Sequence, residues 1–355
     1  EEETAQKIKD VLREIGVQEV HSKFSQQSIL AEINGNKPGN TILFRCELDA
    51  LPIKEINDFS YHSKNNGVSH KCGHDGHMAI LLALAHKLIN HPPEEGKFLL
   101  LFQSAEETGE GARSIIESGF LDAFNIDYAL SLHNVPGYNK KSIVCKENEF
   151  TPSVESFEVQ LKGETSHAGE PDKGKNPANC IAEIIDHIQS LHQPNPKDKD
   201  YFIVAPIHIN MGKRAYGTSA GQANIGYTIR AVNHNDFMQR KMALEKKIRK
   251  LAQKHSLQYS IEWKEAFASN NNQKNVVKFI EKAARQLKLE YIRKEDPFDW
   301  GEDFGLFTQH YSGAMFGLGS GKETPPLHDA NYDFPDEIIE TGKDMFYSLA
   351  NELQL

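Results

Sequence analysis

One almost continuously apolar run constrains the fold more than any other part of the chain. Residues Lys97–Ala105 have the composition of a β-strand that is covered on both faces. Two similar runs, Thr41–Leu51 and Asp127–His133, are also predicted to be buried strands, and helical segments such as Met78–Ile89 separate the strands. Buried strands that alternate with helices predict an α/β fold with a mostly parallel sheet.

The pattern changes near Ser153. Val154–Lys162 alternates apolar and polar residues, as a half-exposed antiparallel strand does. Further strands are predicted at Tyr201–Asn210, Gln222–Val232 and Leu257–Trp263, and helices at Pro177–Leu191 and Phe237–His255. This set predicts a ferredoxin-like α+β unit. Because the first pattern resumes near residue 270, we expect one α/β domain, residues 1–152 and 266–355, interrupted by an inserted domain, residues 153–265.

Composition excludes several classes of protein. The chain has 355 residues, a length typical of two domains, and a net charge of −10, which argues against a nucleic-acid partner. No stretch approaches the roughly 20 apolar residues that span a membrane. Its four cysteines are widely spaced, which predicts reduced thiols and a cytoplasmic location. The charged first residues predict no signal peptide, but the chain begins without methionine, so a removed targeting segment stays open.

The densest set of chemically capable residues is the segment Lys71–His77. Cys72, His74, Asp75 and His77 are all residue types that bind metal ions, and the glycines between them permit a tight backbone. Taken alone, the segment is ambiguous. Cys72 with His77 could equally form a thiol nucleophile, and a buried histidine is often structural.

Two adjacent carboxylates, Glu106 and Glu107, follow the apolar run Lys97–Ala105. Buried carboxylates are costly unless a positive charge neutralises them, and the carboxyl ends of strands bind ligands in open α/β sheets. Adjacent residues of an extended chain point in opposite directions. We therefore expect one carboxylate to bind a metal ion and the other to face the substrate. A solvated turn is the structural alternative.

Three further histidines are candidates. His133 ends the predicted strand Asp127–His133, and His328 follows a glycine-rich turn near the chain end. Each would more often be structural if it stood alone, but their joint placement beyond strand ends favours a metal centre. His167, in the glycine-rich segment Gly163–Gly169, is weak evidence alone and could simply be exposed.

In this order, the segments resemble the co-catalytic metallopeptidase family of aminoacylases and carboxypeptidases. The nearest resemblance is to its N-acyl-amino-acid amidohydrolase branch, which includes hippurate hydrolases and plant auxin-conjugate hydrolases. The matching stretches cover nearly the whole chain: Arg45–Pro52, Cys72–His77, Phe102–Glu107, His133 with Pro136 and Gly137, Gly163–Gly169, Glu302–Phe304 and Pro326–His328. The resemblance implies a phosphorylase/hydrolase-like catalytic domain with the inserted domain as a lid that also forms a homodimer.

The resemblance also implies two divalent metal ions. Zinc is the first expectation because it favours cysteine and histidine, and manganese is its competitor. The implied ligands are Cys72, His74, Glu107, His133 and His328, with Cys72 in the position of a bridging carboxylate.

Other roles follow from the same resemblance. Glu106 is implied to be the general base for a metal-activated water, and Asp49 and Asp75 are implied to orient ligands. His167 would reach the reacting carbonyl, often from the partner subunit. Arg230 would hold a substrate carboxylate, a task that suits its planar fork.

Three departures from the family pattern concern specificity more than the metal centre. Tyr216–Gly221 stands where the lid usually carries an Asn-x-Ile-Pro turn, which puts its substrate contacts in doubt. Glu47 stands where the branch commonly has aspartate, and the usual tryptophan after His133 is absent.

The sequence therefore predicts a metal-dependent amidohydrolase that cleaves N-acyl amino acids or related small conjugates and has neither a nucleic-acid nor a membrane partner. A metallo-carboxypeptidase or dipeptidase on the same fold is the first alternative. A thiol hydrolase would leave most of the candidate ligands unexplained. An inactive binding or regulatory protein on the same fold is the alternative of another class.

Overall fold

The computed structural model describes residues 1–195, 198 and 200–354. The chain divides into two compact units, each of which is described by itself. The first contains Glu1–Thr151, Asn270–Phe298 and the segment from Glu302 on, and the second contains Pro152–Ser269 and Asp299–Gly301. No helix in the described part of the chain is both long and apolar enough to span a membrane.

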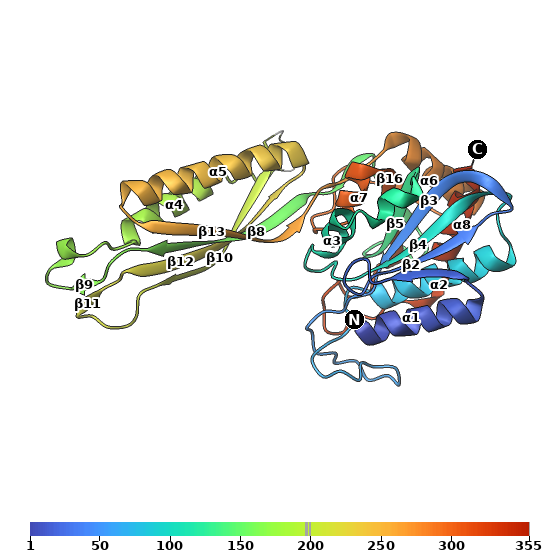
Figure 1. The fold of residues 1–355 in the computed structure, drawn as a ribbon, viewed down its shortest axis with the longest axis horizontal. Coiled ribbons are helices and arrows are strands. Elements are labelled where there is room, and N and C mark those ends of the chain that lie inside the picture. Colours follow the sequence, from blue (N-terminus) through green and yellow to red (C-terminus); the bar gives the residue numbers. More distant parts are fainter. Residues whose placement is uncertain (196–197, 199, 355) are drawn as a thin grey trace. The chain divides into compact units, whose positions relative to one another are not determined.

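The first unit is built on a twisted sheet (Figure 1). In the described residues the sheet has eight strands in the order β1-β2-β4-β3-β5-β16-β6-β15. Strand β3 pairs in parallel with β4 and β5, and β5 pairs in parallel with β16, so the predicted mostly parallel sheet is confirmed. The strands are β1 (Glu19–Ser22), β2 (Ile29–Asn34), β3 (Lys37–Glu47), β4 (Glu95–Gln103), β5 (Tyr128–Pro136), β6 (Ile143–Cys145), β15 (Tyr291–Arg293) and β16 (Ser312–Gly321). A separate pair joins β7 (Asn148–Thr151) to β14 (Asn270–Asn272).

Helices bury their apolar faces against this sheet. Leu12, Leu84 and Phe346, from three different helices, belong to the same buried cluster as Phe44 of β3 and Phe98 of β4. Burial of such side chains is the main source of stability for a unit of this kind. The helices are α1 (Glu2–Ile15), α2 (His74–Asn90), α3 (Gly111–Glu117), α6 (Lys274–Gln286), α7 (Gly305–His310) and α8 (Ile339–Glu352), with short 3-10 turns η1 (Phe120–Phe124) and η3 (Asp336–Ile338).

Three predicted boundaries that bear on the candidate site were wrong. Strand β3 ends at Glu47 rather than Leu51, and Leu51 forms an antiparallel bridge with Ser69 instead. Helix α2 begins at His74 rather than Met78. Gly73 precedes it with a φ of 87°, a left-handed conformation that glycine adopts at no steric cost. Strand β5 continues through His133 to Pro136, so this histidine lies within the strand.

The second unit is an antiparallel sheet with helices along one face (Figure 1). Over the residues described, the sheet has four strands in the order β10-β12-β8-β13. Its buried side chains alternate along β8, where Phe157, Val159 and Leu161 pack in the apolar cluster of this unit. The predicted α+β arrangement is confirmed. Its elements are β8 (Ser153–Lys162), β9 (Ser166–His167), η2 (Pro171–Lys173), α4 (Ala178–Ser190), β10 (Phe202–Met211), β11 (Thr218–Ser219), β12 (Gln222–Ala231), α5 (His234–Lys254) and β13 (Gln258–Phe267).

Candidate metal centre

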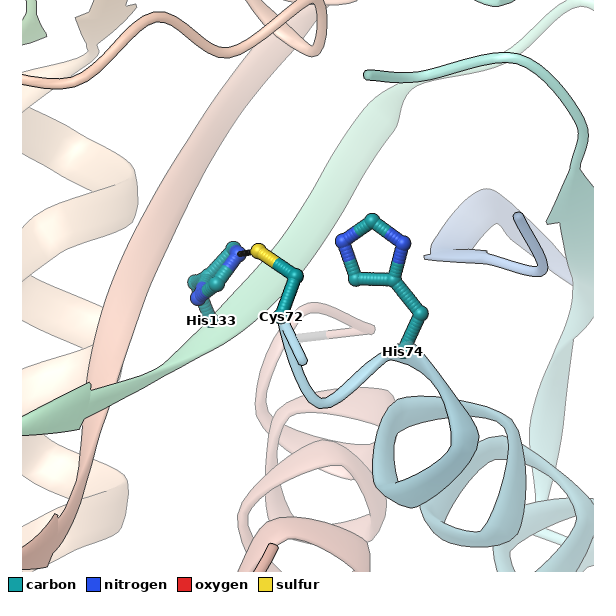
Figure 2. Close-up of side chains that lie close together, drawn as sticks. All are labelled: Cys72, His74 and His133. Atoms are coloured by element: carbon teal, nitrogen blue, oxygen red, sulfur yellow. Dashed lines mark hydrogen bonds between the residues drawn. The ribbon is translucent and has the colours of Figure 1, made fainter. Parts of the chain in front are cut away.

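Neighbouring strands of the first unit bring the candidate ligands together. Strand β3 lies between β4 and β5, and all three run in the same direction. Glu107 follows the end of β4, and His133 lies near the end of β5. Cys72 immediately precedes α2, and His74 is its first residue. Figure 2 shows the Cys72 thiol directed toward His133, with the His74 ring beside it.

The five predicted ligands form overlapping groups. The ligand atoms of Cys72, His74 and His133 lie within 4.8 Å of one another, and so do those of Cys72, Glu107 and His328. The Cys72 Sγ lies 3.6 Å from His133 Nε2, and His328 Nε2 lies 3.5 Å from Glu107 Oε1. Because Cys72 belongs to both groups, its sulfur is placed where one atom could contact two ions.

The donor set fits a cation. His74 Nδ1 lies 2.9 Å from Asp49 Oδ1, so its hydrogen bond is directed away from the ligand group. His74 Nε2 and Glu107 Oε1, 3.9 Å apart, are both buried and have no hydrogen-bond partner. Asp49 also accepts a hydrogen bond of 2.8 Å from the Glu107 backbone N–H. A carboxylate behind a histidine ligand, with the far ring nitrogen facing a carboxylate, is the arrangement found around protein-bound metals.

The Glu106–Glu107 pair does not have the extended geometry that we expected. Ala105 has a φ of 54°, and Glu106 begins a turn that a hydrogen bond of 2.7 Å from Gly109 N–H to the Glu106 carbonyl closes. Both carboxylates therefore face His74 Nε2, at 4.0 Å for Glu106 and 3.9 Å for Glu107. The expectation of opposite directions was wrong because the left-handed residue reverses the chain.

Backbone constraints support the same cluster. His328, like Ala105, is in the left-handed region, with a φ of 68°. This conformation is uncommon for residues other than glycine, and here it occurs at His328 itself and just before Glu106. A side chain at Gly73 would meet the Asn134 amide at 2.7 Å, and one at Gly76 would meet the Phe334 ring at 2.4 Å. These two glycines are therefore required where the chain carries Cys72 and His74.

Burial controls the charges of the cluster. It raises the pKa of Glu106 well above its usual range, and the carboxylates of Glu302 and Asp303 add to the rise. It also raises the pKa of the Cys72 thiol to about 12. Burial lowers the pKa of His133 well below its usual range, which favours the neutral ring that a metal ligand requires. For His74 burial acts in the same direction, but Cys72 and Asp49 outweigh it and raise its pKa.

The remaining predicted site residues are Asp75 in the first unit and two residues of the second unit. Asp75 is exposed, and its carboxylate accepts a hydrogen bond of 3.0 Å from Gly76 N–H. Among the described residues, no hydrogen bond or ion pair joins Asp75 to any of the five ligands. His167 and Arg230 belong to the second unit.

In that unit, His167 lies on β9 and is exposed. Its Nδ1 accepts a hydrogen bond of 3.1 Å from Gly169 N–H, so the proton of the neutral ring is on Nε2. Arg230, on β12, donates a hydrogen bond of 2.6 Å from Nη1 to the carbonyl of Asp299.

The His77 ring, the alternative partner of Cys72 in a thiol nucleophile, lies beside Asn134, a residue that the sequence motifs do not single out. His77 Nε2 accepts a hydrogen bond of 3.1 Å from Asn134 N–H, and His77 Nδ1 donates one of 2.6 Å to Glu47. Both ring nitrogens of His77 are thus occupied, which leaves no nitrogen to activate a thiol. Cys72 contacts His133 instead, and its raised pKa opposes a thiolate nucleophile. The geometry therefore argues against the thiol hydrolase.

Comparison of the sequence with known proteins identifies the family of this chain. The model of peptidase family M20/M25/M40 matches residues 43–352. An N-acetyl-L-cysteine deacetylase of Bacillus subtilis is 32% identical, over 99% of this chain and 83% of its own. A hippurate hydrolase of Campylobacter jejuni is 28% identical, over 98% of this chain and 90% of its own.

Solved structures share the fold. A Bacillus subtilis protein described as a dinuclear metal-binding peptidase of the M20 family has a TM-score of 0.83 at 24% identity, over 99% of this chain and 92% of its own. A putative aminohydrolase from methicillin-resistant Staphylococcus aureus has a TM-score of 0.87 at 22% identity, over 100% of this chain and 92% of its own. The resemblance noted from the sequence motifs is confirmed. The protein belongs to peptidase family M20/M25/M40 and is a hydrolase of its metal-binding amidohydrolase class.

Proposed function

We propose that the protein hydrolyses the amide bond of a small N-acyl amino acid. The observation that carries this proposal is the buried Glu106 carboxylate, 4.0 Å from a histidine nitrogen that has no hydrogen-bond partner. Curated relatives that match almost the whole chain are named N-acetyl-L-cysteine deacetylase and hippurate hydrolase, which supports an N-acyl amino acid as the substrate.

We infer that two divalent metal ions bind at the centre. Their ligands would be Cys72, His74, Glu107, His133 and His328, and zinc suits the sulfur and nitrogen donors better than manganese does. When bound, such ions lower the pKa of water and polarise a carbonyl group.

Glu106 is the proposed general base and acid. Its carboxylate accepts a proton from the attacking water and delivers that proton to the nitrogen of the leaving amine. The raised pKa of Glu106, which burial and two nearby carboxylates cause, strengthens its affinity for the proton. Asp49 keeps His74 and Glu107 in place, through the two hydrogen bonds of its carboxylate.

Two residues of the second unit complete the proposal. His167 donates a hydrogen bond from Nε2 to the carbonyl oxygen, where negative charge develops, and the Gly169 contact supports this tautomer. Arg230 binds the carboxylate of the amino acid. Asp75, by contrast, forms no hydrogen bond or ion pair with a ligand in the part of the chain that the structure describes, so no orienting role is proposed for it.

The proposal includes a homodimer and a cytoplasmic location. Edge strand β10 carries the exposed side chains of Ile207, Ile209 and Met211, and within the described residues β12 is the only strand that pairs with it, apart from a bridge between Phe202 and Gln193. An exposed apolar edge strand favours pairing with another chain, and a second copy of this protein is the proposed partner. The four cysteines form no disulfide, which is consistent with a reducing compartment.

Amine release from a panel of N-acyl amino acids and dipeptides tests the function. Each substrate is assayed with zinc, with manganese and with a chelator. We expect chelator-sensitive cleavage of acetyl or benzoyl amino acids. Cleavage of dipeptides alone would favour the peptidase alternative, and chelator-insensitive cleavage would refute the metal-dependent mechanism. A protein that binds metal but cleaves no substrate of the panel would favour the binding protein.

A further inference from the structure

Arg45 is a buried cation with no role in the proposed mechanism. It lies in β3 with no exposed surface, although a buried guanidinium is costly without partners. Its Nε donates a hydrogen bond of 2.9 Å to Gln103, and its Nη2 lies 3.0 Å from Glu302. Its guanidinium also forms ion pairs with the carboxylates of Glu47 and Asp303 and lies over the Phe304 ring.

These three carboxylates are themselves buried. Glu47 and Asp303 have no exposed surface, and Glu302 is 1% exposed. In the part of the chain that the structure describes, no other lysine or arginine forms an ion pair with any of them. The Arg45 guanidinium is therefore shared by three carboxyl groups. Burial raises the pKa of Glu302 to about 8 and that of Asp303 to about 6. Loss of one partner from a buried pair of this kind is strongly destabilising.

Asp303 has the most constrained carboxylate of the three. Gln103 Nε2 donates to both of its oxygens, at 2.9 and 2.7 Å, and Ala112 N–H donates to one of them at 2.9 Å. Arg45 contacts the same carboxylate. Asp303 is thus fastened to β3, β4 and α3 at once.

The backbone of Asp303 reaches the proposed base. Its N–H donates a hydrogen bond of 3.4 Å to Glu106 Oε1. The carboxylate oxygens of Glu106, Glu302 and Asp303 also lie within 4.8 Å of one another. Among the described residues, this N–H is the only hydrogen-bond donor to the Glu106 carboxylate. A glutamate side chain has several rotatable bonds, so its carboxylate keeps one position only if its surroundings hold it.

We propose that Asp303, locked by Arg45, is a positioning residue that holds the Glu106 carboxylate for proton transfer. This inference rests on the proposed function of Glu106 and extends it to the Arg45 and Glu302–Phe304 motifs. The Asp303 side chain never meets the substrate. It fixes a short stretch of backbone whose N–H binds one Glu106 oxygen, which leaves the other oxygen, 4.0 Å from His74 Nε2, to exchange the proton.

Asp303→Asn tests the proposal, with Glu155→Gln as the matched control. Both substitutions replace a buried carboxylate that pairs with a basic side chain, because Glu155 is 6% exposed and accepts a hydrogen bond of 2.7 Å from Lys241 in the second unit. An asparagine at 303 would turn an NH2 group toward donors that now bind oxygen. We expect a kcat that is about ten- to a hundredfold lower, as small misplacements of reacting groups cause, with unchanged KM and metal content. Glu155→Gln should lower Tm and leave kcat unchanged.

Arg45→Lys is the second, milder test, because lysine keeps the charge but cannot contact all the partners of the guanidinium. We expect a smaller loss of kcat than in Asp303→Asn, again without loss of metal. If Asp303→Asn does not fold, this variant decides.

Wild-type kcat in folded, metal-loaded Asp303→Asn or Arg45→Lys would overturn the inference, and so would a loss of kcat that only follows lost metal. Wild-type protein that cleaves no substrate would instead refute the proposed function. Metal content is measured by elemental analysis and folding by circular dichroism, so that these outcomes are distinguished.

Discussion

Replacement of Asp49 by asparagine should weaken metal binding while leaving the fold intact. The Asp49 carboxylate is 5% exposed and has two partners, His74 Nδ1 at 2.9 Å and Glu107 N–H at 2.8 Å. Both partners act as donors when a metal ion is bound. An asparagine can accept from one of them, but its NH2 group then faces the other.

The magnitude follows from the number of ligands affected. Loss of a hydrogen bond behind a ligand typically reduces metal affinity by about ten- to a hundredfold. Since each factor of ten corresponds to about 1.4 kcal/mol, we expect a loss of roughly 1.4 to 2.8 kcal/mol of binding free energy. The upper part of this range applies if both His74 and Glu107 lose their orientation.

Competition of the protein with a chromophoric chelator measures the affinity. Asp75→Asn is the matched control, because it makes the same chemical change in the first turn of α2, where the carboxylate is exposed and, among the described residues, has its hydrogen bond with Gly76 N–H. It should leave metal affinity unchanged. Equal affinity in wild type and Asp49→Asn, or equal losses in both variants, would refute the reasoning that Asp49 orients the ligands.

Four further predictions follow. Glu106→Ala should lower turnover by orders of magnitude with metal content retained; turnover close to that of wild type would refute its role as the base. Metal binding should release protons at pH 7, because burial raises the pKa of the Cys72 thiol to about 12, and calorimetry in buffers of different ionisation enthalpy measures this release. In metal-free protein, burial raises the pKa of Glu302 from 4.5 in the unfolded chain to about 8 in the folded state. Between these two pH values, Glu302 therefore binds more protons in the folded state than in the unfolded state. Its stabilising contribution is complete below pH 4.5 and is lost progressively as pH rises to about 8; thermal melts of wild type and Glu302→Gln should therefore diverge between pH 4.5 and pH 8, and melts that stay parallel across this range would contradict the assignment. Ile209→Lys, on the exposed edge of β10, should shift sedimentation toward monomer, whereas an unchanged oligomeric state would exclude this edge as the interface.

Local patterns were sufficient for much of the fold. The apolar run from Lys97 predicted strand β4, because a strand buried on both faces needs apolar residues at every position. The alternation from Val154 predicted strand β8, because one face of that strand meets the helices and the other does not. Short strands such as β1 and β6 were missed, since a few residues carry too little periodicity to distinguish a strand from a loop.

Local patterns also identified the residue types of the site but not all of their geometry. The segment Cys72–His77 contains two histidines, and the residue types alone do not distinguish which of them binds a metal ion. Of the two, only His74 has a ring nitrogen without a hydrogen-bond partner. The difference arises from Asn134 and Glu47, which are distant in sequence and occupy both nitrogens of His77. Similarly, Asp75 is adjacent to His74 in sequence and Asp49 is distant from it, but of the two only Asp49 contacts a ligand.

The sequence by itself therefore determined the α/β pattern, the inserted α+β unit and the family, because each depends on periodicity or on short motifs whose spacing is local. Tertiary structure alone decided which side chains meet. The contact between Arg45 and Asp303 joins residues separated by most of the chain, and the left-handed Ala105 turns both Glu106 and Glu107 toward His74. Such contacts depend on how strands pair and on how the backbone turns, and neither is recorded in the spacing of residues along the chain.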